Sequence, residues 1–194
     1  MFGRIGLLTL PSNAAILVID VQEGFDDPQW GSRNNPDAEK VIASMLGVWR
    51  ETSRPVLHVQ HLSKFEGSPL HPANAGCKIK EEVQPFQGEM VFQKRVNSAF
   101  IGTSLEENLR DQGIDTIVMV GLTTPHCVST SARMAATLGF HVYLAKDAIA
   151  AFGITGPDGK NHSAEEIHQI SLATLHDEFA TITDSRTLID AALS

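Results

Sequence analysis

Three residues that lie far apart in the sequence have the side chains that a cysteine nucleophile and its activation require. Cys127 follows an apolar run and a turn, where a helix is predicted to begin. The unpaired N–H groups and positive dipole end of that helix would favour a thiolate and lower the pKa of Cys127. Asp20 offers a carboxylate to take the thiol proton, and Lys94 offers a cation to hold the thiolate. Cysteine often merely fills space in a core, so position alone leaves a packing role equally open.

The predicted strands would bring these three residues to one edge of a sheet. Asp20, Lys94 and Cys127 lie at or just past the carboxyl ends of the first, third and fourth strands. In open parallel sheets, ligands bind at this edge, beside the point where the strand order reverses. The six predicted strands cover residues 14–20, 55–61, 90–94, 116–120, 141–146 and 179–183.

Helical patterns alternate with the strands. One covers residues 37–51, and another begins near Cys127. Two more follow the capping boxes predicted at residues 103–106 and 163–166, and the last begins at about residue 185. This alternation predicts an α/β fold, with helices on both faces of a parallel sheet and right-handed crossovers.

Two segments without periodicity are predicted to be loops. Residues 148–161 are rich in glycine, and residues 62–89 mix glycine, proline and charges. A loop as long as the second is usually functional, so we expect either a lid or part of an oligomer interface. Its apolar residues Leu70, Ile79, Val83 and Phe86 would suit an interface.

Length, charge and cysteine content exclude several classes. The 194 residues predict one domain spanning 1–194, and a net charge of −8 without basic runs argues against a nucleic-acid partner. The apolar runs are too short to span a membrane, and no signal peptide is evident, which predicts a cytoplasmic protein. Two cysteines without C-x-x-C spacing predict free thiols, and no G-x-G-x-x-G follows the first strand.

Three motifs in a fixed order resemble the isochorismatase-like family of cysteine hydrolases. They are I-D-V-Q at residues 19–22 with Phe25, K-R-V-N-S-A-F at 94–100, and G-L-T-T-x-x-C-V-x-x-S-A-x-x-A at 121–135. The resemblance covers nearly the whole chain. It implies a three-layer, doubly wound six-stranded parallel sheet in the order 3-2-1-4-5-6. It also implies an Asp–Lys–Cys triad that maps onto Asp20, Lys94 and Cys127.

The same resemblance implies a reaction. A cis peptide at Leu122–Thr123 would aim the N–H groups of Thr123 and Cys127 at an oxyanion. Members that cleave the vinyl ether of isochorismate lack the cysteine, so hydrolysis of a C–N bond through a thioester is favoured here. The substrate would be a small amide, carbamoyl compound or lactam. Pro125 stands where relatives often carry Asn, which argues against adopting any one relative's substrate.

The resemblance also suggests pocket residues and partners. Candidates for substrate binding are Gln22, Phe25, His61, Phe100, Thr124 and His126, although either phenylalanine could equally belong to the core. Relatives with a metal bind it through Asp-x-His after the second strand, whereas this chain has Gln60 and His61 there. On a strand, His58 and His61 point to opposite sides, so we expect no metal and no cofactor. A homodimer or homotetramer is expected.

Two alternative functions remain. One is a vinyl ether hydrolase of the isochorismatase type. The other is a non-catalytic thiol sensor or ligand-binding protein that uses oxidation of Cys127. The sensor leaves Asp20 and Lys94 unexplained, and comparing Cys127 alkylation with ammonia release from amides would separate the alternatives.

Overall fold

A computed structural model describes residues 8–194 and contains a six-stranded sheet in the order β3-β2-β1-β4-β5-β8. Every neighbouring pair in this sheet is parallel. The predicted strand order is confirmed, with β8 as its sixth strand. The strands are β1 (Ala15–Ile19), β2 (Val56–His61), β3 (Met90–Lys94), β4 (Thr116–Leu122), β5 (His141–Ala150) and β8 (Thr181–Thr183).

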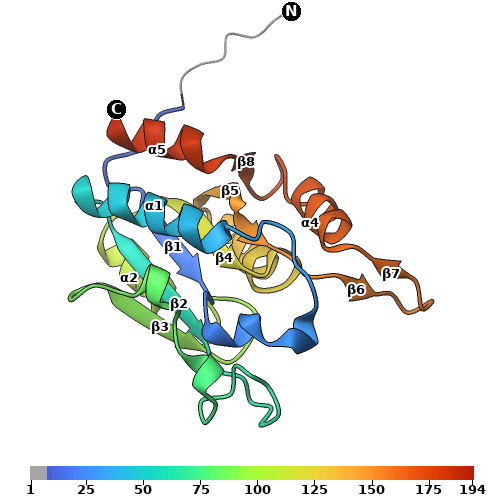
Figure 1. Cartoon of the computed structure of the whole chain (residues 1–194). Coiled ribbons are helices and arrows are strands. Elements are labelled where there is room, and N and C mark those ends of the chain that lie inside the picture. The colour runs from blue at the N-terminus through green and yellow to red at the C-terminus, as the bar shows by residue number, and fades with distance from the viewer. Residues whose placement is uncertain (1–7) are drawn as a thin grey trace, which may run out of the picture.

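Helices cover both faces of the sheet, so the fold has the three layers that were predicted (Figure 1). Ile16 and Val18 of β1 pack in one core cluster with residues of α1 and α5. Leu17 and Ile19 point the other way, into a cluster with α2, α3 and α4. This alternation is that of a strand buried on both faces. The helices are α1 (Ala38–Glu51), α2 (Leu105–Asp111), α3 (Ser129–Thr137), α4 (Ala164–Ala173) and α5 (Ser185–Leu193).

The end of β4 lies unusually close to β1. Gly121 has φ +118, and a Cβ added there would lie 2.0 Å from the carbonyl oxygen of Ile19. Only glycine tolerates both this conformation and this approach. The chain that follows Gly121 therefore begins directly beside the end of β1, where Asp20 lies.

Strand β5 is longer than the predicted 141–146 and continues to Ala150. The charged residues Lys146 and Asp147 lie inside it. A register shift lets the chain rejoin β4 beyond them, and the Asp147 carboxylate accepts hydrogen bonds from the N–H and hydroxyl of Ser185. Asp147 thus holds the start of α5, which explains a charge inside a buried strand.

The segment after β5 is only partly a loop. Strands β6 (Ile154–Thr155) and β7 (Asn161–His162) form a small antiparallel hairpin that projects from the body (Figure 1). The capping box at Ser163 and Glu166 is confirmed at the start of α4. The box predicted at Thr103 is wrong, because α2 begins after Ser104 and the Thr103 hydroxyl donates to the Ala99 carbonyl.

The 62–89 segment folds against its own chain. It contains the short 3-10 helices η3 (Ala75–Cys77) and η4 (Glu81–Val83). Leu70 and Val83 are buried and Ile79 is partly buried, so these three do not form the exposed apolar surface that was expected. Phe86 is 61% exposed. The oligomeric state stays a prediction.

Within residues 8–194, every helix is too short or too polar to cross a lipid bilayer.

Candidate active site

Four neighbouring strands each deliver one residue to the same edge of the sheet. Asp20 follows β1, His61 ends β2, Lys94 ends β3, and Cys127 lies in the turn after β4. His61 and Lys94 are paired across β2 and β3, which places their side chains next to each other. The predicted meeting of Asp20, Lys94 and Cys127 is therefore observed, with His61 as a fourth member.

The Lys94 ammonium group lies at the centre of these four side chains. Its Nζ donates to Asp20 Oδ2 at 2.6 Å, lies 3.0 Å from His61 Nδ1 and donates to Cys127 Sγ at 3.3 Å. A lysine has three donors, so these contacts use all of them. Both the Lys94 and Asp20 side chains are fully excluded from solvent. Lys94 is therefore positioned to influence the charge of both the carboxylate and the sulfur.

Asp20 has an unusual backbone and an unsatisfied oxygen. Its φ is +51, a left-handed conformation that non-glycine residues seldom adopt and that clusters at functional sites. Among the described residues, none donates a hydrogen bond to its Oδ1. Burial raises the pKa of the Asp20 carboxyl, against the opposing charge of Lys94. A buried carboxylate with a raised pKa and a free oxygen is a suitable proton acceptor.

Cys127 lies in a single π-helical turn, η5 (Thr124–Val128), immediately before α3. The Thr123 carbonyl accepts hydrogen bonds from the N–H groups of His126 and Val128, which fixes the turn. The peptide bond between Leu122 and Thr123 is cis. The α-helix thus begins two residues later than predicted, with the cysteine in a π turn of the kind often found at functional sites.

The predicted lowering of the Cys127 pKa is wrong. Burial, followed by the nearby Asp20 charge, raises the pKa of the thiol to about 12, although Lys94 opposes the shift. Position near a helix start could be inferred from the sequence, but the degree of burial could not. Cys127 therefore carries its proton in the resting protein and needs a base to become a nucleophile.

His61 is held as a neutral acceptor for Lys94. Burial, followed by the Lys94 charge, lowers the pKa of His61 to about 4. Gln22, fully buried, fixes the backbone of His61: its amide donates to the His61 carbonyl at 3.0 Å, and its Oε1 accepts the His61 N–H at 2.8 Å. Gln22 thus braces the end of β2.

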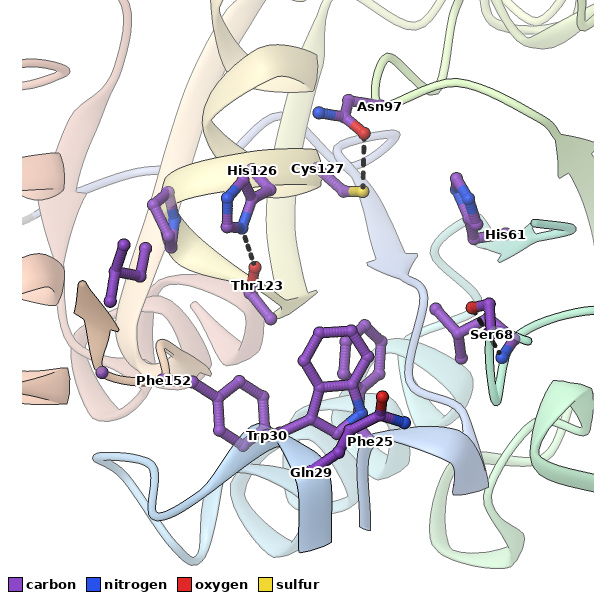
Figure 2. Close-up of a pocket in the computed structure, with 14 residues that line it drawn as sticks. Phe25, Gln29, Trp30, His61, Ser68, Asn97, Thr123, His126, Cys127 and Phe152 are labelled. Atoms are coloured by element: carbon purple, nitrogen blue, oxygen red, sulfur yellow. Dashed lines mark hydrogen bonds between the residues drawn. The ribbon is translucent and has the colours of Figure 1, made fainter. Parts of the chain in front are cut away.

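A cavity of about 420 Å³ opens above the sulfur. This volume is typical of small-molecule sites. Figure 2 shows the Cys127 sulfur at one end and the rings of Phe25, Trp30 and Phe152 at the other. The lining residues are Phe25, Gln29, Trp30, His61, Ser68, Leu70, Asn97, Thr123, Pro125, His126, Cys127, Phe152, Gly153 and Ile154.

Three of the six predicted substrate-binding residues line this cavity, namely Phe25, His61 and His126. The other three lie elsewhere. Gln22 is enclosed by backbone groups; Phe100 packs on Phe140, with ring centres 6.0 Å apart; Thr124 Oγ1 lies 3.0 Å from Nδ1 of the buried His168. These three side chains stabilise the surroundings of the cavity and do not face it.

Most of the apolar wall could not be predicted from the sequence. Phe25, Trp30 and Phe152 form a cluster with ring centres 5.5 to 6.2 Å apart. The Trp30 indole N–H donates to the Gly24 carbonyl at 2.8 Å. Trp30 and Phe152 come from polar, glycine-rich segments about which periodicity says nothing. A large aromatic residue inside such a segment was the one available signal.

The donor set does not suit a metal ion. Ligand atoms of Asp20, His61 and Cys127 lie within 4.8 Å of one another. However, the Lys94 ammonium contacts all three side chains, so a cation would meet a like charge at their centre. These residues fit a protonated lysine better than a metal.

Comparison with known proteins identifies the family. The Isochorismatase domain model matches residues 14–187. The isochorismatase family protein YrdC of Bacillus subtilis is 51% identical, covering 91% of this chain and 94% of its own. Nicotinamidase 3 of Arabidopsis thaliana is 30% identical, covering 88% and 84%.

Comparison with solved structures identifies the same family. A crystal structure from Chromobacterium violaceum, described as a hydrolase of the isochorismatase family, superposes with a TM-score of 0.93 at 39% identity, covering 96% of this chain and 97% of that one. On both sequence and structure, this chain belongs to the isochorismatase family.

Proposed function

We propose that the protein is a cysteine amidohydrolase that cleaves a C–N bond of a small molecule through a thioester. One observation carries the proposal: the Lys94 ammonium bridges a buried carboxylate and a thiol at the end of a ligand-sized cavity. The name of the relative Nicotinamidase 3 denotes hydrolysis of an amide, which agrees with this chemistry.

In the first half of the reaction, Asp20 accepts the Cys127 proton as the sulfur attacks the substrate carbonyl. The N–H groups of Thr123 and Cys127 stabilise the oxyanion that forms. When the C–N bond breaks, the proton passes from Asp20 to the departing nitrogen. Ammonia or an amine leaves, and the acyl group stays on the sulfur as a thioester.

In the second half, water attacks the thioester and gives its proton to Asp20. The tetrahedral intermediate releases the carboxylic acid, and the proton returns from Asp20 to the Cys127 sulfur. The Lys94 ammonium contacts both Asp20 and the sulfur, so it offsets negative charge on either of them.

The raised pKa of Cys127 weighs against the thiol-sensor alternative. Peroxide reacts with thiolates, and redox sensors are cysteines with low pKa and good exposure. Cys127 has a pKa of about 12 and is only 8% exposed. The vinyl ether alternative gives the sulfur no role, so it leaves the Asp20–Lys94–Cys127 arrangement unused.

The proposal is tested by ammonia release from a panel of small amides, carbamoyl compounds and lactams. Cys127→Ala should lower kcat by at least about 10⁴-fold, because nucleophilic catalysis is lost while the fold stays intact. Cys77→Ala is the matched control, since Cys77 is the other buried free thiol, and it should leave turnover unchanged. Appreciable turnover by Cys127→Ala would contradict the mechanism.

A further inference from the structure

The lining of the cavity narrows the substrate class. We infer that the substrate is an uncharged amide whose acyl group is a hydrocarbon, aromatic or branched. The inference rests on the proposed function and adds to it the nature of the group attached to the carbonyl. It is carried by the contrast between the two ends of the cavity (Figure 2).

None of the fourteen lining residues is an aspartate, glutamate, lysine or arginine. The two histidines in the wall, His61 and His126, are neutral near physiological pH, because burial lowers the pKa of each. The Lys94 ammonium, which contacts the sulfur at the edge of the cavity, already has its three donors directed at protein atoms. A carboxylate on the substrate would lose water here without gaining a counter-ion, which strongly disfavours its binding.

The wall opposite the sulfur is a continuous apolar surface. Phe25, Trp30 and Phe152 contact one another, Leu70 packs in the same cluster, and Ile154 also lines the cavity. Trp30 is the one ring of the three with a hydrogen-bond donor, and its N–H is bound to the Gly24 carbonyl. The three rings can thus offer packing and stacking to a substrate, but no hydrogen bond to a ring nitrogen, and Gln29 is the polar side chain beside them (Figure 2).

Polar groups occur mainly at the other end, near the reacting carbonyl. Asn97 Oδ1 lies 3.9 Å from Cys127 Sγ, and His126 Nδ1 lies 3.0 Å from the Thr123 hydroxyl. All of these groups are uncharged and suit the amide itself. An amide held with its C–N bond at Cys127 therefore directs its acyl group towards the aromatic wall.

The experiment compares amides that share one shape. Phenylacetamide, its para-nitro and para-carboxy derivatives and its 3-pyridyl analogue are measured with the wild-type protein for kcat/KM. Nitro and carboxylate have nearly the same shape and differ in charge. The para-nitro compound should exceed the para-carboxy compound by roughly 100-fold or more. Phenylacetamide should exceed the pyridyl analogue. Equal or better use of the para-carboxy compound would overturn the inference.

Binding to Cys127→Ala, measured by calorimetry, separates this inference from the proposed function. If the uncharged amides bind this variant and the wild type releases no ammonia from them, the proposed function fails while the preference of the cavity for uncharged ligands stands. If ammonia is released but the carboxylate is preferred, the substrate class fails while the function stands. Equal binding of the para-nitro and para-carboxy compounds to Cys127→Ala would also overturn the inference that the substrate is uncharged.

Two pairs of variants test the wall directly. Phe152→Leu should lower kcat/KM for phenylacetamide by about tenfold through lost ring contacts, whereas Phe140→Leu, in the core away from the cavity, should not.

Gln29→Arg places a cation in the wall and should raise the kcat/KM of the para-carboxy compound relative to that of the para-nitro compound. Gln29→Met, of similar length without charge, should not. An unchanged preference in Gln29→Arg would contradict the electrostatic argument.

Discussion

Two clusters in this protein each pair a buried lysine with a buried carboxylate, and these two carboxyl groups have opposite pKa shifts. In the Glu39 cluster, which consists of Asp26, Arg33, Glu39 and Lys80, both Glu39 oxygens accept hydrogen bonds from Arg33, and Oε1 also accepts one from Lys80 at 2.7 Å. Burial opposes ionisation, but these bonds prevail and lower the pKa of Glu39 to about 2.

In the Asp20 cluster, which consists of Asp20, His61, Lys94 and Cys127, the carboxylate has one cation and one free oxygen. Burial prevails and raises the pKa of Asp20. Both carboxylates are shielded from water, at 0% exposure for Asp20 and 6% for Glu39. The number of donors, and not burial, therefore decides the sign of the shift.

The comparison shows that a buried lysine–carboxylate pair does not by itself mark an active site. The Glu39 cluster is saturated, and its members Asp26 and Arg33 flank the segment that carries Trp30. It fixes the apolar wall of the cavity. The Asp20 cluster leaves an acceptor open beside a thiol, as a site that must accept a proton requires.

The largest expected difference between the clusters is in catalysis. Asp20→Asn keeps the shape of the side chain but removes the proton acceptor, so kcat should fall by roughly 10²–10⁴-fold. Glu39→Gln alters a bracing group and should change kcat less than tenfold, with the remaining effect in KM. Ammonia release measures both, and thermal unfolding confirms that each variant is folded. A loss of kcat in Glu39→Gln as large as in Asp20→Asn would remove the distinction.

The sequence predicted the Asp20 cluster better than the Glu39 cluster for a topological reason. Asp20, Lys94 and Cys127 end strands or follow them, and parallel strands bring their ends together whatever the loops do. The strand order itself came from family resemblance. His61 also ends a strand beside Lys94, so its contact with Lys94 follows from the same rule.

Most of the site residues that the sequence does not predict lie in loops. Trp30 and Phe152 meet across more than a hundred residues, and no periodic pattern records such a contact. The shift in the pKa of Cys127 was predicted in the wrong direction because the thiol is buried in the core cluster that contains Ile19 and Ala99, which its position near a helix start does not reveal. Phe100 and Thr124 belong to the motifs but face inward, and a motif does not say which way a side chain points.

A second difference should appear in stability as pH changes. Glu39 has a folded pKa of about 2 and an ordinary value of 4.5. Its contribution is complete above pH 4.5 and is lost as pH falls towards 2; it amounts to about 3 kcal/mol. The contribution of Asp20 to stability depends on pH in the opposite direction. Because its folded pKa is raised, stability is lost as the pH rises above the ordinary pKa of an aspartate.

Denaturant unfolding near neutral pH and at about pH 3 measures this difference. Glu39→Gln should be destabilised near neutral pH, and its loss relative to wild type should shrink in acid. The stability of Asp20→Asn should not approach that of the wild type in acid in the same way. If both variants converge with wild type in acid, the two carboxylates do not differ in sign.

The smallest expected effect concerns the reactivity of the thiol, and it tests where the resting proton lies. Since the Asp20 charge helps to raise the pKa of Cys127, Asp20→Asn should lower that pKa and speed alkylation at mildly alkaline pH by about tenfold. Glu39→Gln should leave the rate unchanged. The measurement is made in a Cys77→Ala background, so that only one thiol reacts.

Turnover and alkylation should thus move in opposite directions in Asp20→Asn, because the carboxylate suppresses the resting thiolate yet is needed to take its proton during attack. Slower alkylation in this variant would mean that the resting proton is already on Asp20 and that Cys127 is a thiolate paired with Lys94. Asp20 would then act only as the acid that protonates the leaving nitrogen. The mechanism would keep its residues but lose the general-base step.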